Sequence, residues 1–171
     1  MVTCDDMKDS DLQSSMSWVT PPAEGDAVLT FLSAAVRALG GRSDAALART
    51  MHVQPHLIAN WRRRMTIPDE HVVWFRTTFV EKVGTFNNDL PQVSLEARAA
   101  VVLLVAETDG DPIDAGNSAS IAAGLALGGL LALAQFLVDV GAGWETEKLV
   151  QIMRPLMMTF RRADYLRASI A

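Results

Sequence analysis

The stretch from residue 43 to residue 64, SDAALARTMHVQPHLIANWRRR, has the pattern of a helix, a tight turn and a second helix. Ser43 is a favourable helix N-cap, and Ala46, Leu47 and Met51 then recur at helical spacing. The first of these two helices is therefore expected to end near Met51.

The turn and the second helix have their own signals. His52 stands where the backbone must be left-handed, a conformation that His tolerates better than most residues other than glycine. Pro55 fits the first position of a helix, where its missing N–H costs nothing. Ile58 and Trp61, three residues apart, are expected to point into the core. The pattern predicts a second helix from about Pro55 to Arg64.

The exposed side of that second helix carries side chains able to reach base edges of DNA. This side is expected to present Gln54, His56, Leu57 and Asn60. A run of three arginines, residues 62–64, follows at once and can hold phosphates. The segment therefore has the chemistry of a DNA-binding helix.

A wider pattern resembles a known family. Three parts of the sequence resemble the helix-turn-helix of phage CI-type repressors, within the lambda-repressor-like group. They are Leu47-Ala48-Arg49, Ile58-Ala59-Asn60-Trp61-Arg62-Arg63-Arg64 and Ile67-Pro68. The most specific part is a second helix that ends in Asn-Trp, followed by basic residues and Ile-Pro. The resemblance covers roughly residues 26–84.

The resemblance implies site residues. It places Gln54, Pro55, His56 and Asn60 in base-facing positions, with Asn60 able to bond adenine through two hydrogen bonds. Phosphate contacts are expected from Ser43, Arg62, Arg63 and Arg64.

Two positions depart from the family pattern. The family usually has Gly where His52 stands, and Gln or a similar phosphate-binding residue where Asp44 stands. Asp44 favours the positive end of its helix but repels a nearby phosphate, so it disfavours one contact that the family makes with the DNA backbone.

The charge of the chain is unevenly distributed. The formal net charge of the 171 residues is −5. Residues 1–25 carry five acids and one base, residues 26–83 carry eight bases and five acids, and residues 84–171 carry six bases and ten acids. The basic segment coincides with the expected DNA-binding segment, as expected when one part of a protein meets phosphate and the rest does not.

We expect an all-α protein with two small cores rather than one. Residues 1–24 have no apolar period and are expected to be a disordered acidic tail, with Trp18 loosely docked. Residues 25–86 would form the helix-turn-helix domain, beginning with a helix over Asp26–Leu39 that stops at Gly40-Gly41. A later helix is expected to start in a capping box formed by Thr66 and Asp69 and to end at Gly84.

Residues 87–92 are the expected linker, and residues 93–171 are expected to form an all-helical oligomerisation domain. Ser94 would cap a helix that runs to about Thr108. A central helix of this domain would cover residues 121–138. Pro155 would kink or split a last helix over residues 144–169. The expected oligomer interface consists of Gly124, Gly128, Leu131, Leu149, Leu156 and Phe160.

The second half also contains weaker signals for a membrane span and for a metal site. Residues 121–138 carry no charge and are long enough to suggest a membrane span, but they are rich in Ala and Gly and have no aromatic and basic anchors on both sides. Asp109, Asp111 and Asp114 weakly suggest a calcium loop, but the central glycine and closing glutamate of such a loop are missing. Neither a membrane span nor a metal site is expected.

No catalytic residues and no cofactor are expected either. His52, His56 and His71 all lie in the DNA-binding segment, and the single cysteine, Cys4, lies in the tail, which suits a reducing cytoplasm. Ala115-Gly116 is the dipeptide at which self-cleaving repressors are cut, but those carry a β-rich peptidase domain, whereas this chain shows helices downstream. Self-cleavage is therefore not expected.

The resulting expectation is a cytoplasmic transcriptional regulator, of the phage or prophage repressor type, that binds double-stranded operator DNA as a homodimer or higher homo-oligomer. Two alternatives stay open. In the first, the second domain binds a partner protein, such as an antirepressor or a toxin, and DNA binding serves autoregulation. A membrane-tethered regulator is the other alternative.

Overall fold

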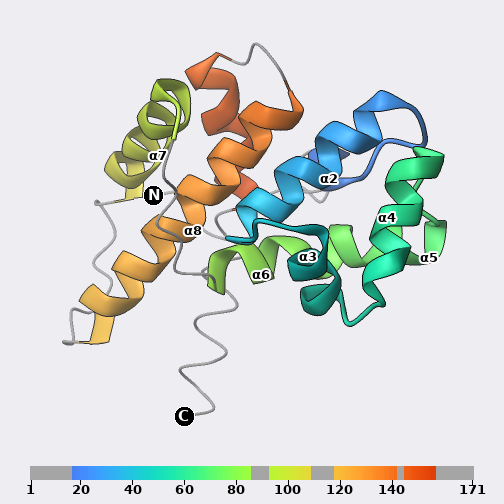
Figure 1. Cartoon of the computed structure of the whole chain (residues 1–171). Coiled ribbons are helices and arrows are strands. Elements are labelled where there is room, and N and C mark those ends of the chain that lie inside the picture. The colour runs from blue at the N-terminus through green and yellow to red at the C-terminus, as the bar shows by residue number, and fades with distance from the viewer. Residues whose placement is uncertain (1–16, 86–92, 109–117, 142–144, 157–171) are drawn as a thin grey trace.

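A computed structural model describes residues 17–85, 93–108, 118–141 and 145–156 of the chain. Within these residues every regular element is helical, which confirms the all-α class (Figure 1). The elements are η1 (Ser17–Val19), α2 (Asp26–Ala38), α3 (Asp44–Met51), α4 (Pro55–Arg64), α5 (Asp69–Trp74), the π-helical turn η2 (Phe75–Phe79), α6 (Val80–Thr85), α7 (Leu95–Thr108) and α8 (Ser118–Val140). One further helical segment covers residues 146–156.

Helix α8 is central to the whole described fold, whereas residues 121–138 were expected to be the central helix of the second domain alone. It packs against α2, α6 and α7 (Figure 1). The ring of Phe136 in α8 meets Phe31 of α2 edge to face, with centroids 5.4 Å apart, and Phe79 of η2 at 4.9 Å. The buried residues of both halves therefore form one continuous core, and the expectation of two separate small cores is not met. Residues 121–138 of α8 are apolar around the helix except for Gln135, so contact with both halves of the chain buries more apolar surface than contact with one half.

A chain of polar contacts crosses the same junction. The Ser94 N–H donates to Oε1 of Gln135 at 2.8 Å, and Nε2 of Gln135 donates to Oδ1 of Asp139 at 2.9 Å. The other oxygen of Asp139 accepts from Nη1 of Arg37 at 2.6 Å. These contacts join the start of α7 to α8, and α8 to α2.

The segment before α2 is ordered from residue 17 onwards. Val19 is fully buried, Pro21 is buried, and Nε of Arg76 donates to Oγ1 of Thr20 at 3.1 Å. The expectation of a disordered tail is therefore wrong for residues 17–24, and residues 1–16 lie outside the described residues. Two isolated apolar residues give no periodic signal, although both are buried and Val19 belongs to the core.

The helix after α4 also differs from its prediction at both ends and in the middle. Its N-cap is Pro68, and no side chain caps it. Thr66, expected in a capping box, instead donates its hydroxyl to the Ala23 carbonyl at 3.2 Å. The helix passes through a π-helical turn at η2 and continues to Thr85, one residue beyond the predicted end. Its inner side packs into the core, since Phe75, Phe79 and Val83 are fully buried, while Val72 is half-buried.

Helix α7 begins where the sequence predicts, and it is helical up to Thr108, the last described residue before a gap. The Ala97 N–H donates to Oγ of Ser94 at 3.2 Å, which is the expected N-cap bond. One face of α7 is buried, through Ala97, Ala100, Val101 and Leu104. The opposite face, which we call the outer face of α7, exposes 78% of Leu95, 66% of Val102 and 48% of Leu103.

The six residues expected at the oligomer interface differ in how accessible they are. Leu149 and Leu156 are fully buried within a single chain, so neither is available to a second copy, and this part of the prediction is wrong. Leu131 is half-buried against the same core, and Gly128 is half-buried in α8. Gly124 lies in α8 at a position whose exposure is not described, and Phe160 lies outside the described residues.

Pro155 belongs to the helical segment 146–156 and is buried there, so the described part of that helix does not split at Arg154. The predicted linker and the weak calcium-loop candidate lie outside the described residues. Within the described ranges, no helix combines the length and apolarity needed to cross a membrane.

Candidate nucleic-acid interface

Helices α3 and α4 meet through the turn that the sequence predicts. His52 caps α3 in the left-handed conformation, with φ 57° and ψ 37°. The next N–H, that of Val53, donates to the Ala48 carbonyl at 2.9 Å and closes the turn. Helix α4 starts at Pro55 and ends at Arg64, as predicted. The local backbone is therefore fixed by a tolerant residue in the turn and a proline at the first helical position.

The inner side of α4 is anchored in the core. Ile58 is fully buried and Trp61 is 4% exposed. The His71 ring lies against the Trp61 ring, with centroids 4.7 Å apart. This anchoring fixes which side of α4 faces outwards.

Three side chains form a line along that outer side. His56, Asn60 and Arg63 stand at positions i, i+4 and i+7 of α4, opposite the buried Ile58 and Trp61. His56 and Arg63 are exposed, and Asn60 is half-buried. We call these three residues the reading line of α4.

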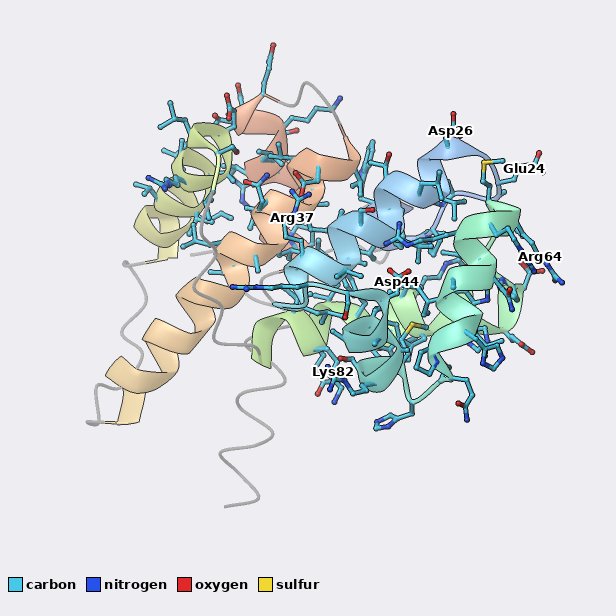
Figure 2. The ribbon with its side chains drawn as sticks, viewed as in Figure 1. Glu24, Asp26, Arg37, Asp44, Arg64 and Lys82 are labelled. Carbon is cyan, nitrogen blue, oxygen red and sulfur yellow. The ribbon has the colours of Figure 1, made fainter. Side chains whose placement is uncertain are left out.

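The other predicted contacts lie around the reading line. Gln54 and Pro55 are exposed where α4 begins, and Arg64 is exposed where it ends. Figure 2 shows the Arg64 side chain at the outer edge of the molecule. Ser43, at the start of α3, is exposed and its hydroxyl caps no backbone N–H. The structure thus leaves these four predicted contact residues accessible.

Within the reading line, Arg63 and Asn60 are bonded to each other. Nη2 of Arg63 donates to Oδ1 of Asn60 at 3.0 Å. The sequence predicts separate roles for these residues, a phosphate contact for Arg63 and a base contact for Asn60. Their spacing of three residues on one helix was the signal that they could meet.

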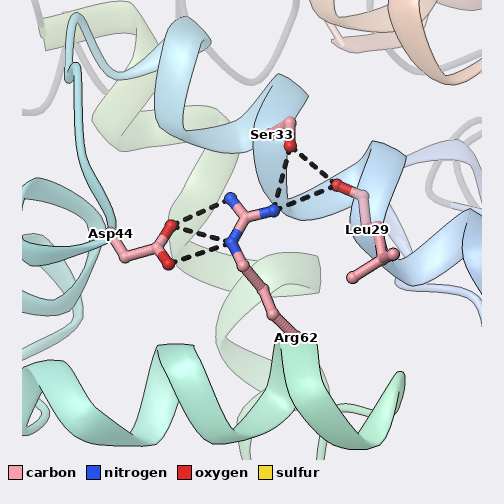
Figure 3. Close-up of polar contacts among 4 residues, drawn as sticks. All are labelled: Leu29, Ser33, Asp44 and Arg62. Atoms are coloured by element: carbon pink, nitrogen blue, oxygen red, sulfur yellow. Dashed lines mark hydrogen bonds and ion pairs between the residues drawn. The ribbon is translucent and has the colours of Figure 1, made fainter.

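Arg62 does not face outwards with its two neighbours. Its guanidinium lies between α3 and α2 (Figure 3). Nε donates to both carboxylate oxygens of Asp44 at 2.9 Å, and Nη1 donates to Oγ of Ser33 at 3.0 Å and to the Leu29 carbonyl at 3.4 Å. Arg62 therefore holds the three helices together, and we do not retain it as a phosphate contact.

Helical geometry explains this placement. Arg62 follows the buried Ile58 by four residues, so both lie on the same side of α4. Asp44, which departs from the family pattern in the sequence, is the partner that this inward-pointing arginine needs. Both departures from expectation at residues 44 and 62 thus belong to one ion pair.

A shallow open hollow of about 270 Å³ lies beside this ion pair. It lies next to the first turn of α3 and is lined by Ser33, Val36, Arg37, Gly41, Arg42, Ser43, Asp44 and Arg62. Its polar side chains are three arginines, two serines and one carboxylate. Within the described part of the chain, no group of three or more His, Cys, Asp or Glu side chains is placed to hold a metal ion.

The outer side of α4, with its amide, imidazole and guanidinium groups, is thus the feature whose chemistry most clearly suggests a ligand. No protein-family model matches this chain, and neither a curated protein nor a solved structure matches it.

Proposed function

We propose that this protein is a sequence-specific DNA-binding transcriptional regulator of the phage-repressor type, in which α3 and α4 form a helix-turn-helix. The observation that carries the proposal is the reading line of His56, Asn60 and Arg63 on the exposed side of a helix whose other side is anchored by Ile58 and Trp61. A helix of this kind, set off by a tight turn from its predecessor, fits the major groove of B-DNA.

The chemistry of each exposed group suits a part of the duplex. The carboxamide of Asn60 matches the donor and acceptor that adenine presents in the major groove. The imidazole of His56 and the amide of Gln54 can each donate and accept a hydrogen bond at a base edge. Arg64 carries a charge that attracts phosphates without reading sequence. Arg62 contributes indirectly, because it keeps α4 aligned with α3 and α2.

Assembly belongs to the same proposal. One helix-turn-helix binds DNA weakly, and two copies would read half-sites about 34 Å apart. We propose a second copy of this chain as the partner of the outer face of α7, because Leu149 and Leu156 are used within the protomer whereas Leu95, Val102 and Leu103 remain exposed. Helix α7 lies on the opposite side of the molecule from α4 (Figure 1), so pairing there leaves both copies of α4 accessible.

The test begins with selection of bound sequences from a pool of random duplexes by the full-length protein. Binding to the selected duplex and to a shuffled duplex is then measured by fluorescence anisotropy at two salt concentrations. We expect tight, salt-sensitive binding to the selected duplex only. Asn60→Ala should reduce the preference between the duplexes, whereas Arg64→Ala should weaken both alike and lower the salt slope by about 0.9 if it loses one phosphate contact.

Failure to select any sequence, or equal losses on both duplexes for both variants, would overturn the proposal. The rival function, an autoregulator whose second half binds an antirepressor or a toxin, is favoured by the same outer face of α7. It would be supported if the purified protein binds its duplex as a monomer and forms a stoichiometric complex with a protein of another sequence.

A further inference from the structure

We infer that Arg63 is a positioning residue that fixes which way round Asn60 presents its carboxamide to a base. This inference rests on the proposed function, because it concerns how α4 discriminates between bases. It changes the role of Arg63 from a general phosphate contact to a determinant of specificity.

The geometry of the pair supports this role. Nη2 of Arg63 lies 3.0 Å from Oδ1 of Asn60, and both side chains belong to the reading line. A guanidinium has five N–H donors and no acceptor. It can therefore bond the oxygen of a carboxamide but not its NH2 group, so this contact favours one of the two orientations that the amide could adopt.

The orientation matters because adenine has a polar pattern with a direction. In the major groove, adenine offers the N6 amino group as a donor and N7 as an acceptor. A correctly oriented Asn60 accepts from N6 and donates to N7. A flipped amide would set NH2 against NH2 and oxygen against N7, and both contacts would be lost.

The bond to Arg63 does not use up the amide. Oδ1 of Asn60 has two lone pairs, so it can accept from Arg63 and from a base at the same time, and both protons of Nδ2 remain available. Arg63 keeps four further N–H donors, which can reach a phosphate or a neighbouring base. The pair therefore joins a base-reading group to a charged group in one unit.

Arg64 provides a matched control. It is the adjacent residue, is also exposed, and carries the same charge, and it stands four residues after Asn60 on the same side of α4. Among the described contacts, only Arg63 donates a hydrogen bond to Asn60. Arg63→Met and Arg64→Met each remove one positive charge from the same end of α4. Any difference between them in base discrimination reports on the bond to Asn60 and not on charge.

The experiment uses the full-length protein and the duplex obtained by selection. Asn60→Ala first identifies the base pair that Asn60 reads, as the position where substitution of the duplex no longer matters. Discrimination at that pair is the ratio of Kd values for the substituted and the selected duplex. We expect Arg63→Met to lower this ratio roughly tenfold, as the loss of an oriented two-bond contact should, and Arg64→Met to leave it unchanged.

A double variant supplies the second readout. Asn60→Ala combined with Arg63→Met should show the same discrimination as Asn60→Ala alone, because Arg63 acts through Asn60. Thermal melting should show that Arg63→Met folds normally, as expected for an exposed side chain. If the wild-type protein selects a sequence but Arg63→Met and Arg64→Met discriminate equally, the inference is overturned and the proposed function stands. If the wild-type protein selects no sequence, both are overturned.

Discussion

Arg62 of α4 donates its Nε–H to both carboxylate oxygens of Asp44, at 2.9 Å each, and so ties the end of one helix to the start of another. Less than a third of either side chain is exposed, 27% for Arg62 and 30% for Asp44. The pair is therefore only partly screened by water, and it sets a negative charge beside the side of α3 that would approach a DNA backbone.

Asp44→Asn should trade stability for DNA affinity. Removal of the carboxylate leaves the Arg62 guanidinium without its main partner, which we expect to lower the free energy of unfolding by about 1 to 2 kcal/mol. It also removes repulsion of phosphate and frees a positive charge. Urea denaturation should show the loss, and anisotropy should show tighter binding to any duplex, most clearly at low salt.

Asp26→Asn is the control for that experiment. Asp26 is an exposed acid in the first turn of α2, as Asp44 is in the first turn of α3. It should lose only the smaller stabilisation that an acid gives a helix N-terminus, about 0.3 to 1 kcal/mol. Equal effects of the two substitutions on stability and on DNA affinity would contradict a special role for the Asp44–Arg62 pair.

Met65→Gly should stabilise the protein. Met65 caps α4 in the left-handed conformation, with φ 51° and ψ 39°, and its side chain is 39% exposed. A residue with a Cβ pays about 1 kcal/mol or more in that conformation, which exceeds the extra chain entropy of glycine in the unfolded state. We expect a gain of about 0.5 kcal/mol and a melting temperature about 1 to 2 °C higher by calorimetry.

Met65→Ala separates backbone strain from the loss of the methionine side chain, since it removes the side chain but keeps the Cβ. It should melt below the wild type. Should Met65→Gly melt no higher than Met65→Ala, backbone strain at this position would be disproved.

Phe136→Ala should destabilise the whole described fold and not just its second half. The Phe136 ring packs against Phe31 and Phe79, and it is 1% exposed, so its removal should cost about 3 to 5 kcal/mol. Three of the four tryptophans, Trp18, Trp61 and Trp74, lie in the first half of the chain. Urea unfolding followed by tryptophan fluorescence and by circular dichroism should therefore shift together.

Phe136→Leu keeps most of the apolar volume and should cost clearly less than Phe136→Ala. Two separate transitions, with tryptophan fluorescence unaffected by Phe136→Ala, would show that the two halves unfold as independent domains after all.

Val102→Asp should break self-association. Val102 lies on the outer face of α7 and is 66% exposed in a single chain, so the substitution leaves the protomer core intact but places a charge in the proposed contact between copies. Sedimentation equilibrium should find a dimer for the wild type and a monomer for the variant.

Val73→Asp is the matched substitution, because Val73 is a similarly exposed valine, 57%, on α5. The dimer should survive it. Loss of the dimer with Val73→Asp but not with Val102→Asp would move the interface to α5, and a monomeric wild type would favour a partner of another sequence.

The sequence predicted best where one residue has few conformational options. Pro55 and His52 set the bounds of α3 and α4 correctly, because a proline at the first helical position and a tolerant residue in a left-handed turn act locally. Ser94 likewise predicted the start of α7, because its hydroxyl caps the first turn. The accessible part of the candidate interface followed from the helical period of α4 alone.

Features that depend on distant partners were missed. The run of three arginines suggested three similar roles, and only the side of α4 on which each one lies separates the inward Arg62 from Arg63 and Arg64. The burial of Val19 depends on residues more than fifty positions away. The joining of the two halves through Phe136 could not be predicted either, since an apolar helix indicates burial without saying against what.

The buried Gln135 determines how α8 packs among its neighbours. A helix whose whole surface is apolar can pack against apolar neighbours in several rotations and axial positions of similar energy. Gln135, the single polar side chain among the buried residues that the structure describes, finds both Ser94 and Asp139 at one angle and one height. These hydrogen bonds add little to stability, but they specify one rotation and one axial position of α8. Any other rotation or position would leave the buried Gln135 amide without hydrogen-bond partners.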